Sequence, residues 1–124
     1  MRANVWAHKR IEELAGEHFP GQEAPLLQRL IGLSALHEAR WKREAAGIYR
    51  PTLGMYALAL QWELESHGPS CAVCREIVRV VEAVPADPGG GDRLALGPRV
   101  PLAEGGLNVP QNLHLGHEAC LAPW

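Results

Sequence analysis

The chain has 124 residues, of which 47% are apolar, and a formal net charge of −2 at pH 7. This length allows one compact domain, or a helical layer around a small metal-stabilised module. The charge and a pI near 6.3 exclude a histone-like protein that coats polyanions. Met1-Arg2-Ala3-Asn4 precedes a mixed polar stretch and not the apolar run of a signal peptide, and no apolar run reaches the roughly 20 residues of a membrane span. We therefore expect no signal peptide and no association with a membrane.

Two helices are predicted in the first 47 residues of the chain. Asn4 can cap a helix that runs to about Glu17, and Phe19-Pro20-Gly21 ends it. A second helix begins near Ala24-Pro25, because proline suits the first helical position, and Gly47 is its expected C-terminal stop.

Three cations lie in the last turns of the second predicted helix: Arg40, Lys42 and Arg43. Cations stabilise a helix C-terminus because its carbonyl groups carry partial negative charge. This effect is a structural explanation for the three side chains. The alternative is a nucleic-acid-binding patch that also includes Arg50.

A third helix is predicted from Leu53 to about Ser66, opened by Pro51-Thr52 and ended by His67-Gly68-Pro69. Its apolar residues cover nearly every side: Leu53, Met55, Tyr56, Leu58, Leu60, Trp62 and Leu64. A helix of this kind is usually buried, so we expect it to be central in the fold.

Strands and turns are predicted after the third helix. Ile77–Val84 is rich in β-branched residues and indicates a strand. The proline- and glycine-rich stretch Pro85–Asp92 is a turn, after which Arg93–Leu96 would return antiparallel to form a hairpin. Gly105-Gly106 marks a second tight turn, and Asn108-Val109-Pro110 can start a short helical turn.

Four residues have the spacing of a zinc site: Cys71 and Cys74, then His117 and Cys120. Two tight pairs of nitrogen and sulfur ligands can close the tetrahedral shell of a structural zinc ion. An odd number of cysteines argues against a disulfide framework, so we expect zinc binding in a reducing compartment, the cytoplasm. A redox-active CxxC motif and a buried CxxC without metal are the alternatives. His114 is a possible substitute for His117 as ligand.

The segment from Val100 to Cys120, VPLAEGGLNVPQNLHLGHEAC, resembles the core of HNH endonucleases. In that family an Asp-His pair precedes a Pro-Leu step, a Gly-Gly turn, an Asn-Leu pair and a second CxxC followed by histidine. Together with Cys71 and Cys74, the resemblance covers roughly residues 67–124. It implies a treble-clef arrangement, in which a cysteine turn, a β-hairpin and a short helix converge on one zinc ion.

The catalytic positions depart from the family pattern. The Asp-His pair falls on Gly97-Pro98, and the histidine after the last zinc cysteine is Leu121. These residues can neither abstract a proton nor bind a metal through a side chain. Asn112 is retained, and the resemblance gives it the role of bracing the hairpin. We therefore predict no catalytic residues, with His114 as the one candidate base if the catalytic groups have moved.

We expect an α+β fold with a three-helix layer over residues 1–66 and an HNH-like zinc module over residues 67–124. Loss of the catalytic side chains with retention of the ligands and turns indicates a scaffold kept for its shape. The predicted function is binding or inhibition of a protein partner, in a phage or mobile-element setting. Residues 71–124 contain four arginines against six acidic residues, which disfavours phosphate binding. The alternatives are DNA or RNA binding without cutting, and a metal-dependent endonuclease with displaced catalytic residues.

Overall fold

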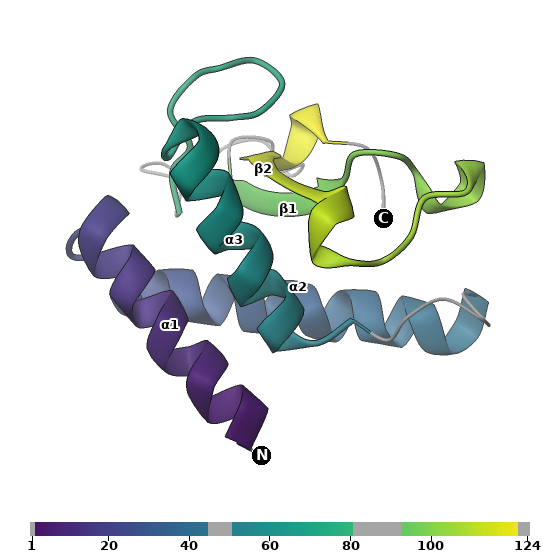
Figure 1. Cartoon of the computed structure of the whole chain (residues 1–124), viewed down its shortest axis with the longest axis horizontal. Helices are drawn as coiled ribbons and strands as arrows, with labels where there is room; N and C mark the ends of the chain where they lie inside the picture. The colour runs from purple at the N-terminus through teal and green to yellow at the C-terminus, as the bar shows by residue number, and fades with distance from the viewer. Residues whose placement is uncertain (1, 45–50, 81–92, 122–124) are drawn as a thin grey trace.

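Three helices followed by a pair of strands make up the described part of the chain (Figure 1). The computed structural model describes residues 2–44, 51–80 and 93–121. The helices are α1 (Arg2–His18), α2 (Glu23–Glu44) and α3 (Leu53–His67), and the strands are β1 (Leu94–Pro98) and β2 (Leu113–His117). Single 3₁₀ turns cover Leu102–Glu104, Pro110–Asn112 and Glu118–Cys120. The predicted α+β class is confirmed, and no helix in these ranges is long and apolar enough to cross a bilayer.

Local sequence signals account for the helix boundaries. The Thr52 side chain caps α3 by accepting a hydrogen bond from the Met55 backbone N–H at 3.2 Å. Gly68 ends α3 with a φ of 70°, a left-handed conformation that glycine adopts at little cost. The predicted stop of α2 at Gly47 lies outside the described residues.

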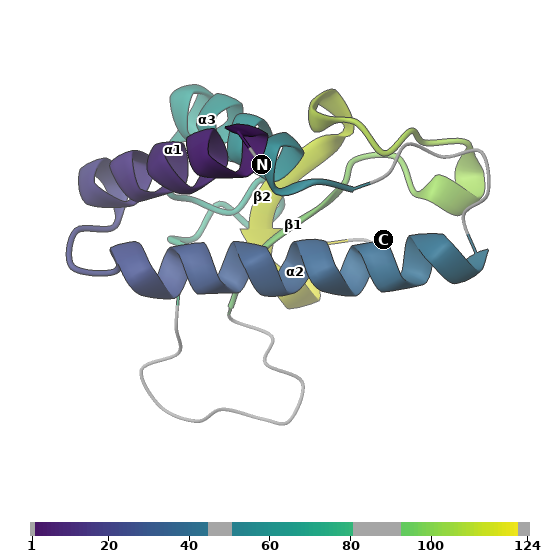
Figure 2. The same cartoon turned by 90° about the horizontal axis from the view of Figure 1, so that it is seen from below.

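Helix α3 is the central element of the core. It contacts α1, α2 and both strands. Figure 2 shows α2 along one side of the molecule, α1 and α3 on the other, and the two strands reaching between them. The buried residues of α3 are Leu53, Met55, Tyr56, Ala57, Ala59, Leu60, Glu63 and Leu64. The prediction of a central third helix is confirmed, although Trp62 is 39% exposed.

The strand pairing differs from the prediction. β1 pairs antiparallel with β2, from Leu94 opposite His117 to Pro98 opposite Leu113. The predicted strand Ile77–Val84 was expected to be the partner, but Ile77 and Arg79 form only isolated bridges, and residues 81–84 lie outside the described part. Val78 and Val80 are each 1% exposed. Val78 and Val80 therefore serve burial in the core and not a sheet ladder, whereas Ile77 is exposed.

Glu63 of α3 covers the free edge of β2. Its carboxylate accepts hydrogen bonds from the backbone N–H of Leu115 at 2.7 Å and from the guanidinium of Arg99, and it lies 3.2 Å from Nε2 of His67. The Leu115 carbonyl accepts a hydrogen bond from the Ala72 N–H at 2.9 Å. An uncovered edge would expose unpaired backbone groups. Glu63, whose side chain is 4% exposed, thus attaches the helical layer to the C-terminal part of the chain.

Replacing Glu63 by glutamine tests this attachment. The amide keeps the shape of the side chain but removes the charge that faces Arg99. Hydrogen bonds to charged groups contribute about 1.5–3 kcal/mol, and the 47% exposure of Arg99 weakens its ion pair. We expect Glu63→Gln to lower the free energy of unfolding by about 2 kcal/mol in urea denaturation. Glu65→Gln, on the exposed face of the same helix, should change it by less than about 0.5 kcal/mol, and equal losses would contradict the attachment.

Candidate metal centre

The first pair of candidate ligands lies in a tight turn after α3. Ser70 and Ile77 form an antiparallel bridge, so the chain between them doubles back and carries Cys71 and Cys74. The Arg75 N–H donates to the Cys71 carbonyl at 3.0 Å. Arg75 has a φ of 71°, which residues other than glycine seldom adopt. The closure of this turn therefore imposes backbone strain next to the two cysteines.

The second pair follows the end of β2. His117 is the last residue of the strand, and Cys120 ends the 3₁₀ turn that begins at Glu118. The Glu118 N–H donates to the Arg93 carbonyl at 2.9 Å. Its carboxylate lies 3.2 Å from the guanidinium of Arg93 and 3.5 Å from that of Arg29. These contacts fix the turn to the start of β1 and to α2.

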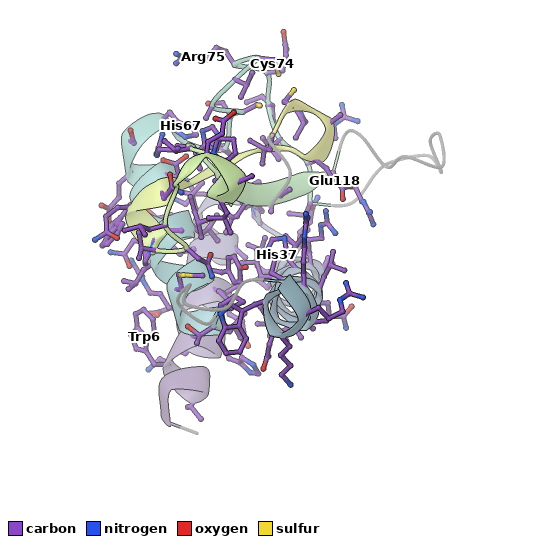
Figure 3. All side chains as sticks on the ribbon, turned by 90° about the vertical axis from the view of Figure 1, so that its right-hand side faces the viewer. Trp6, His37, His67, Cys74, Arg75 and Glu118 are labelled. Atoms are coloured by element: carbon purple, nitrogen blue, oxygen red, sulfur yellow. The ribbon has the colours of Figure 1, made fainter. Side chains whose placement is uncertain are left out.

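The structure brings all four predicted ligands together. The ligand atoms of Cys71, Cys74, His117 and Cys120 lie within 4.8 Å of one another. Nδ1 of His117 is 3.2 Å from the Cys74 sulfur and 3.9 Å from the Cys120 sulfur. In a tetrahedral zinc site, bonds of about 2.3 Å to sulfur and about 2.0 Å to nitrogen separate the ligand atoms by roughly 3.5–3.8 Å. The group can therefore hold one metal ion, at the end of the molecule where Figure 3 shows Cys74.

A hydrogen bond determines which nitrogen of His117 faces the sulfurs. Nε2 lies 3.1 Å from the carbonyl oxygen of Ile77, and because a carbonyl only accepts, Nε2 carries the hydrogen. The neutral ring then has its lone pair on Nδ1, the atom nearest the Cys74 sulfur. Metal-bound histidines are commonly oriented by a hydrogen bond of this kind.

The thiols of Cys71 and Cys120 differ in how readily they ionise. Burial opposes ionisation of Cys71, but hydrogen bonds from the backbone N–H groups of Cys74, His117 and Val73 outweigh it and lower the pKa of this thiol to about 6. Burial and the adjacent sulfurs of Cys74 and Cys71 raise the pKa of the Cys120 thiol to about 11. A bound metal ion would offset the repulsion between neighbouring thiolates, since a thiol that coordinates a metal is deprotonated. The donor set therefore fits a bound cation.

Gly116 is a part of the centre that the sequence analysis missed. A Cβ at this position would lie 2.9 Å from the Cys71 sulfur and 2.8 Å from Cδ2 of Leu121. Contacts this short do not occur, so only glycine lets β2 pass so close to the ligand. The neighbours come from distant parts of the chain, and no spacing pattern in the sequence marks them.

His114, the possible substitute ligand, does not belong to the metal-binding group. It lies opposite Gly97 across the strand pair. Burial and the nearby Arg99 lower the pKa of His114, whereas Glu63 opposes that shift. His114 therefore belongs to the surroundings of Glu63, and His117 provides the imidazole of the centre.

The predicted nucleic-acid contacts lie on another part of the molecule. Arg40, Lys42 and Arg43 belong to the C-terminal part of α2, well apart from the cysteine turn in Figure 1. Lys42 is 3.8 Å from Glu38, one turn earlier. Arg50 lies outside the described residues.

Comparisons of the chain with protein-family models, with curated proteins and with solved structures found no match. The geometry and chemistry of the metal centre are therefore the basis for assigning a function.

The two histidines of β2 provide a matched test of the ligand assignment. We expect one zinc ion per chain to co-purify with the wild type and with His114→Ala. His117→Ala should retain far less after dialysis against a chelator, because one of four ligands is gone. Zinc content by inductively coupled plasma mass spectrometry checks this. Retention by His117→Ala with loss by His114→Ala would reassign the ligand, and a zinc-free wild type would refute the site.

Proposed function

We propose that residues 67–124 form an HNH-like module held together by one structural zinc ion, and that the chain uses it to bind a protein without cutting nucleic acid. The observation that carries the proposal is the convergence of Cys71, Cys74, His117 and Cys120 within 4.8 Å. Four protein ligands fill a tetrahedral shell and leave no position for the water that a catalytic zinc needs. The ion's role is therefore to hold the two chain segments together.

Zinc suits this donor set better than hard divalent cations or an iron–sulfur cluster do. Three thiolates and one imidazole are soft or borderline donors, whereas Mg²⁺, Ca²⁺ and Mn²⁺ prefer oxygen ligands. Iron–sulfur clusters are usually held by four cysteines, and the described centre offers three. A Cys₃His set is an established shell for structural zinc.

The loop between the strands supports the HNH-like interpretation. The Asn112 side chain accepts a hydrogen bond from the Val100 N–H at 3.0 Å, and it donates to the carbonyls of Val100 at 3.0 Å and Leu107 at 2.8 Å. One asparagine thus braces both sides of the loop, the role that the resemblance gives it. A Cβ at Gly106 would lie 1.9 Å from the Val100 carbonyl oxygen, so the second glycine of the Gly-Gly turn serves the same closure.

The positions that carry catalysis in HNH enzymes support a non-cutting role. Gly97 and Pro98 are buried in β1 and offer no side-chain base or metal ligand. Leu121 is apolar and packs against the core. His114 is the remaining candidate base, but the carboxylate near it, Glu63, already accepts hydrogen bonds from a backbone N–H and from a guanidinium.

Surface chemistry around the module favours a protein partner over nucleic acid. Arg93 and Arg99 each form an ion pair with a glutamate, which reduces their availability to phosphate groups. Val73 and Ile77 are 53% and 64% exposed on either side of Cys74. Contiguous exposed apolar patches mark protein-binding surfaces, and these two side chains would contribute to one.

We expect the zinc-loaded protein to leave plasmid, linear and single-stranded DNA intact in the presence of Mg²⁺, Mn²⁺ or Ni²⁺. Phosphodiester hydrolysis needs a base beside the attacking water and a cation at the leaving oxygen, and the module offers no such pair. Cutting that disappears in His114→Ala would show that catalytic groups have moved. Cutting that survives in this variant would come from a contaminant.

The nucleic-acid alternative makes a different prediction. If the cations of α2 contact phosphates, binding of DNA or RNA should weaken steeply with salt, with a log–log slope of about −0.9 per duplex phosphate contact. We expect instead little binding at moderate salt, and no difference between the wild type and an Arg40→Ala/Arg43→Ala variant in fluorescence anisotropy. Salt-dependent binding that this variant loses would favour the alternative.

A further inference from the structure

The ligand cysteines differ in their access to solvent. Cys71 is 0% exposed, and its sulfur accepts hydrogen bonds from the backbone N–H groups of Val73 and His117 at 3.4 Å each. Cys74 is exposed and Cys120 is half-buried. Donated hydrogen bonds withdraw electron density from a sulfur, and burial blocks reagents. Cys71 is therefore protected on both counts, whereas Cys74 can meet a reagent from solvent.

A cavity of about 450 Å³ opens onto the accessible side of the centre. Cys74, His117 and Cys120 line it, together with Glu76, Ile77 and Arg79. A small polar oxidant thus has a path to two sulfurs and one imidazole of the centre. Of the two charged residues in the lining, the Arg79 guanidinium favours an anionic leaving group and the Glu76 carboxylate opposes it.

We infer that Cys74 is a site of oxidative modification at which a peroxide converts the metal centre into a Cys74–Cys120 disulfide and releases the ion. This inference rests on the proposed structural metal and adds a form of regulation to it. The Cys74 thiolate attacks the peroxide, giving a sulfenic acid and hydroxide. The Cys120 thiolate then attacks the sulfenic sulfur and expels a second hydroxide as the disulfide forms. Two electrons pass from the two sulfurs to one peroxide.

Which two cysteines form the disulfide decides whether the two segments of the centre stay joined. A Cys71–Cys74 disulfide would lie within one turn and would leave the 117–120 segment unattached. A Cys74–Cys120 disulfide joins the same two segments as the metal, and the two sulfurs lie within 4.8 Å of each other. The remaining donors, Cys71 and His117, are too few to retain the ion. Oxidation therefore exchanges a metal link for a covalent link, and a reductant with zinc reverses it.

The test treats the full-length, zinc-loaded chain with hydrogen peroxide and follows release with a chromogenic zinc chelator. We expect one zinc ion to leave per chain while the protein loses two hydrogen atoms. After blocking of free thiols and trypsin digestion, peptide 44–75 should be linked to peptide 100–124, with fragmentation assigning the bond to Cys74. A Cys71–Cys74 bond, a Cys71–Cys120 bond or retention of zinc would overturn the inference.

Cys74→His is the matched variant, because it keeps four nitrogen and sulfur donors but removes the accessible thiolate. We expect it to release zinc about tenfold more slowly than the wild type at the same peroxide concentration. Equal rates would contradict the inference. Should this variant fail to hold zinc, the order of alkylation in the wild type decides, with Cys74 first and Cys71 last. The order of alkylation can also be measured on metal-free protein. A chain that binds no zinc would therefore refute the proposed metal, and the alkylation order would still test whether Cys74 is the most accessible thiol.

Discussion

The C-terminal half of this chain depends on the meeting of two short segments, residues 71–74 and 117–120. Residues 75–116 lie between them, and closing a loop of that size costs conformational entropy. The two described strands have five residues each, and a two-stranded pair of this length is marginally stable alone. Four ligand atoms within 4.8 Å can supply the missing constraint, since a metal ion bound there would hold both segments at once.

Strand β2 transmits that constraint to the helical layer. Its last residue, His117, belongs to the metal centre, while the Leu115 N–H on its free edge binds Glu63 of α3. Leu113 and Leu115 are at most 1% exposed and fill the core beside α3. A change in the metal centre therefore reaches α3 through five consecutive residues. This continuity is the physical reason to treat the helices and the module as one cooperative structure. Through the same strand, oxidation of Cys74 would alter the contacts between β2 and α3.

The sequence predicted what depends on local spacing and missed what depends on distant contacts. Caps such as Thr52 and Gly68, and the CxxC spacing, act over a few residues, so the helices and the ligand group followed from them. The predicted pairing of the β-branched segment from Ile77 with the strand at Arg93–Leu96 was wrong, because burial and sheet formation favour the same residue types. Gly116 and Glu63 contact residues of other elements, and no hydrophobic periodicity or sequence motif predicts such contacts.

X-ray absorption at the zinc edge of the purified, reduced chain would show the metal centre directly. A structural zinc centre at this site predicts a four-coordinate ion with three sulfur neighbours at about 2.3 Å and one nitrogen neighbour at about 2.0 Å. His117→Ala should remove the nitrogen contribution, whereas His114→Ala should leave the spectrum unchanged. A shell of five or six oxygen and nitrogen atoms, or fewer than three sulfurs in the wild type, would contradict a structural zinc centre built from Cys71, Cys74, His117 and Cys120.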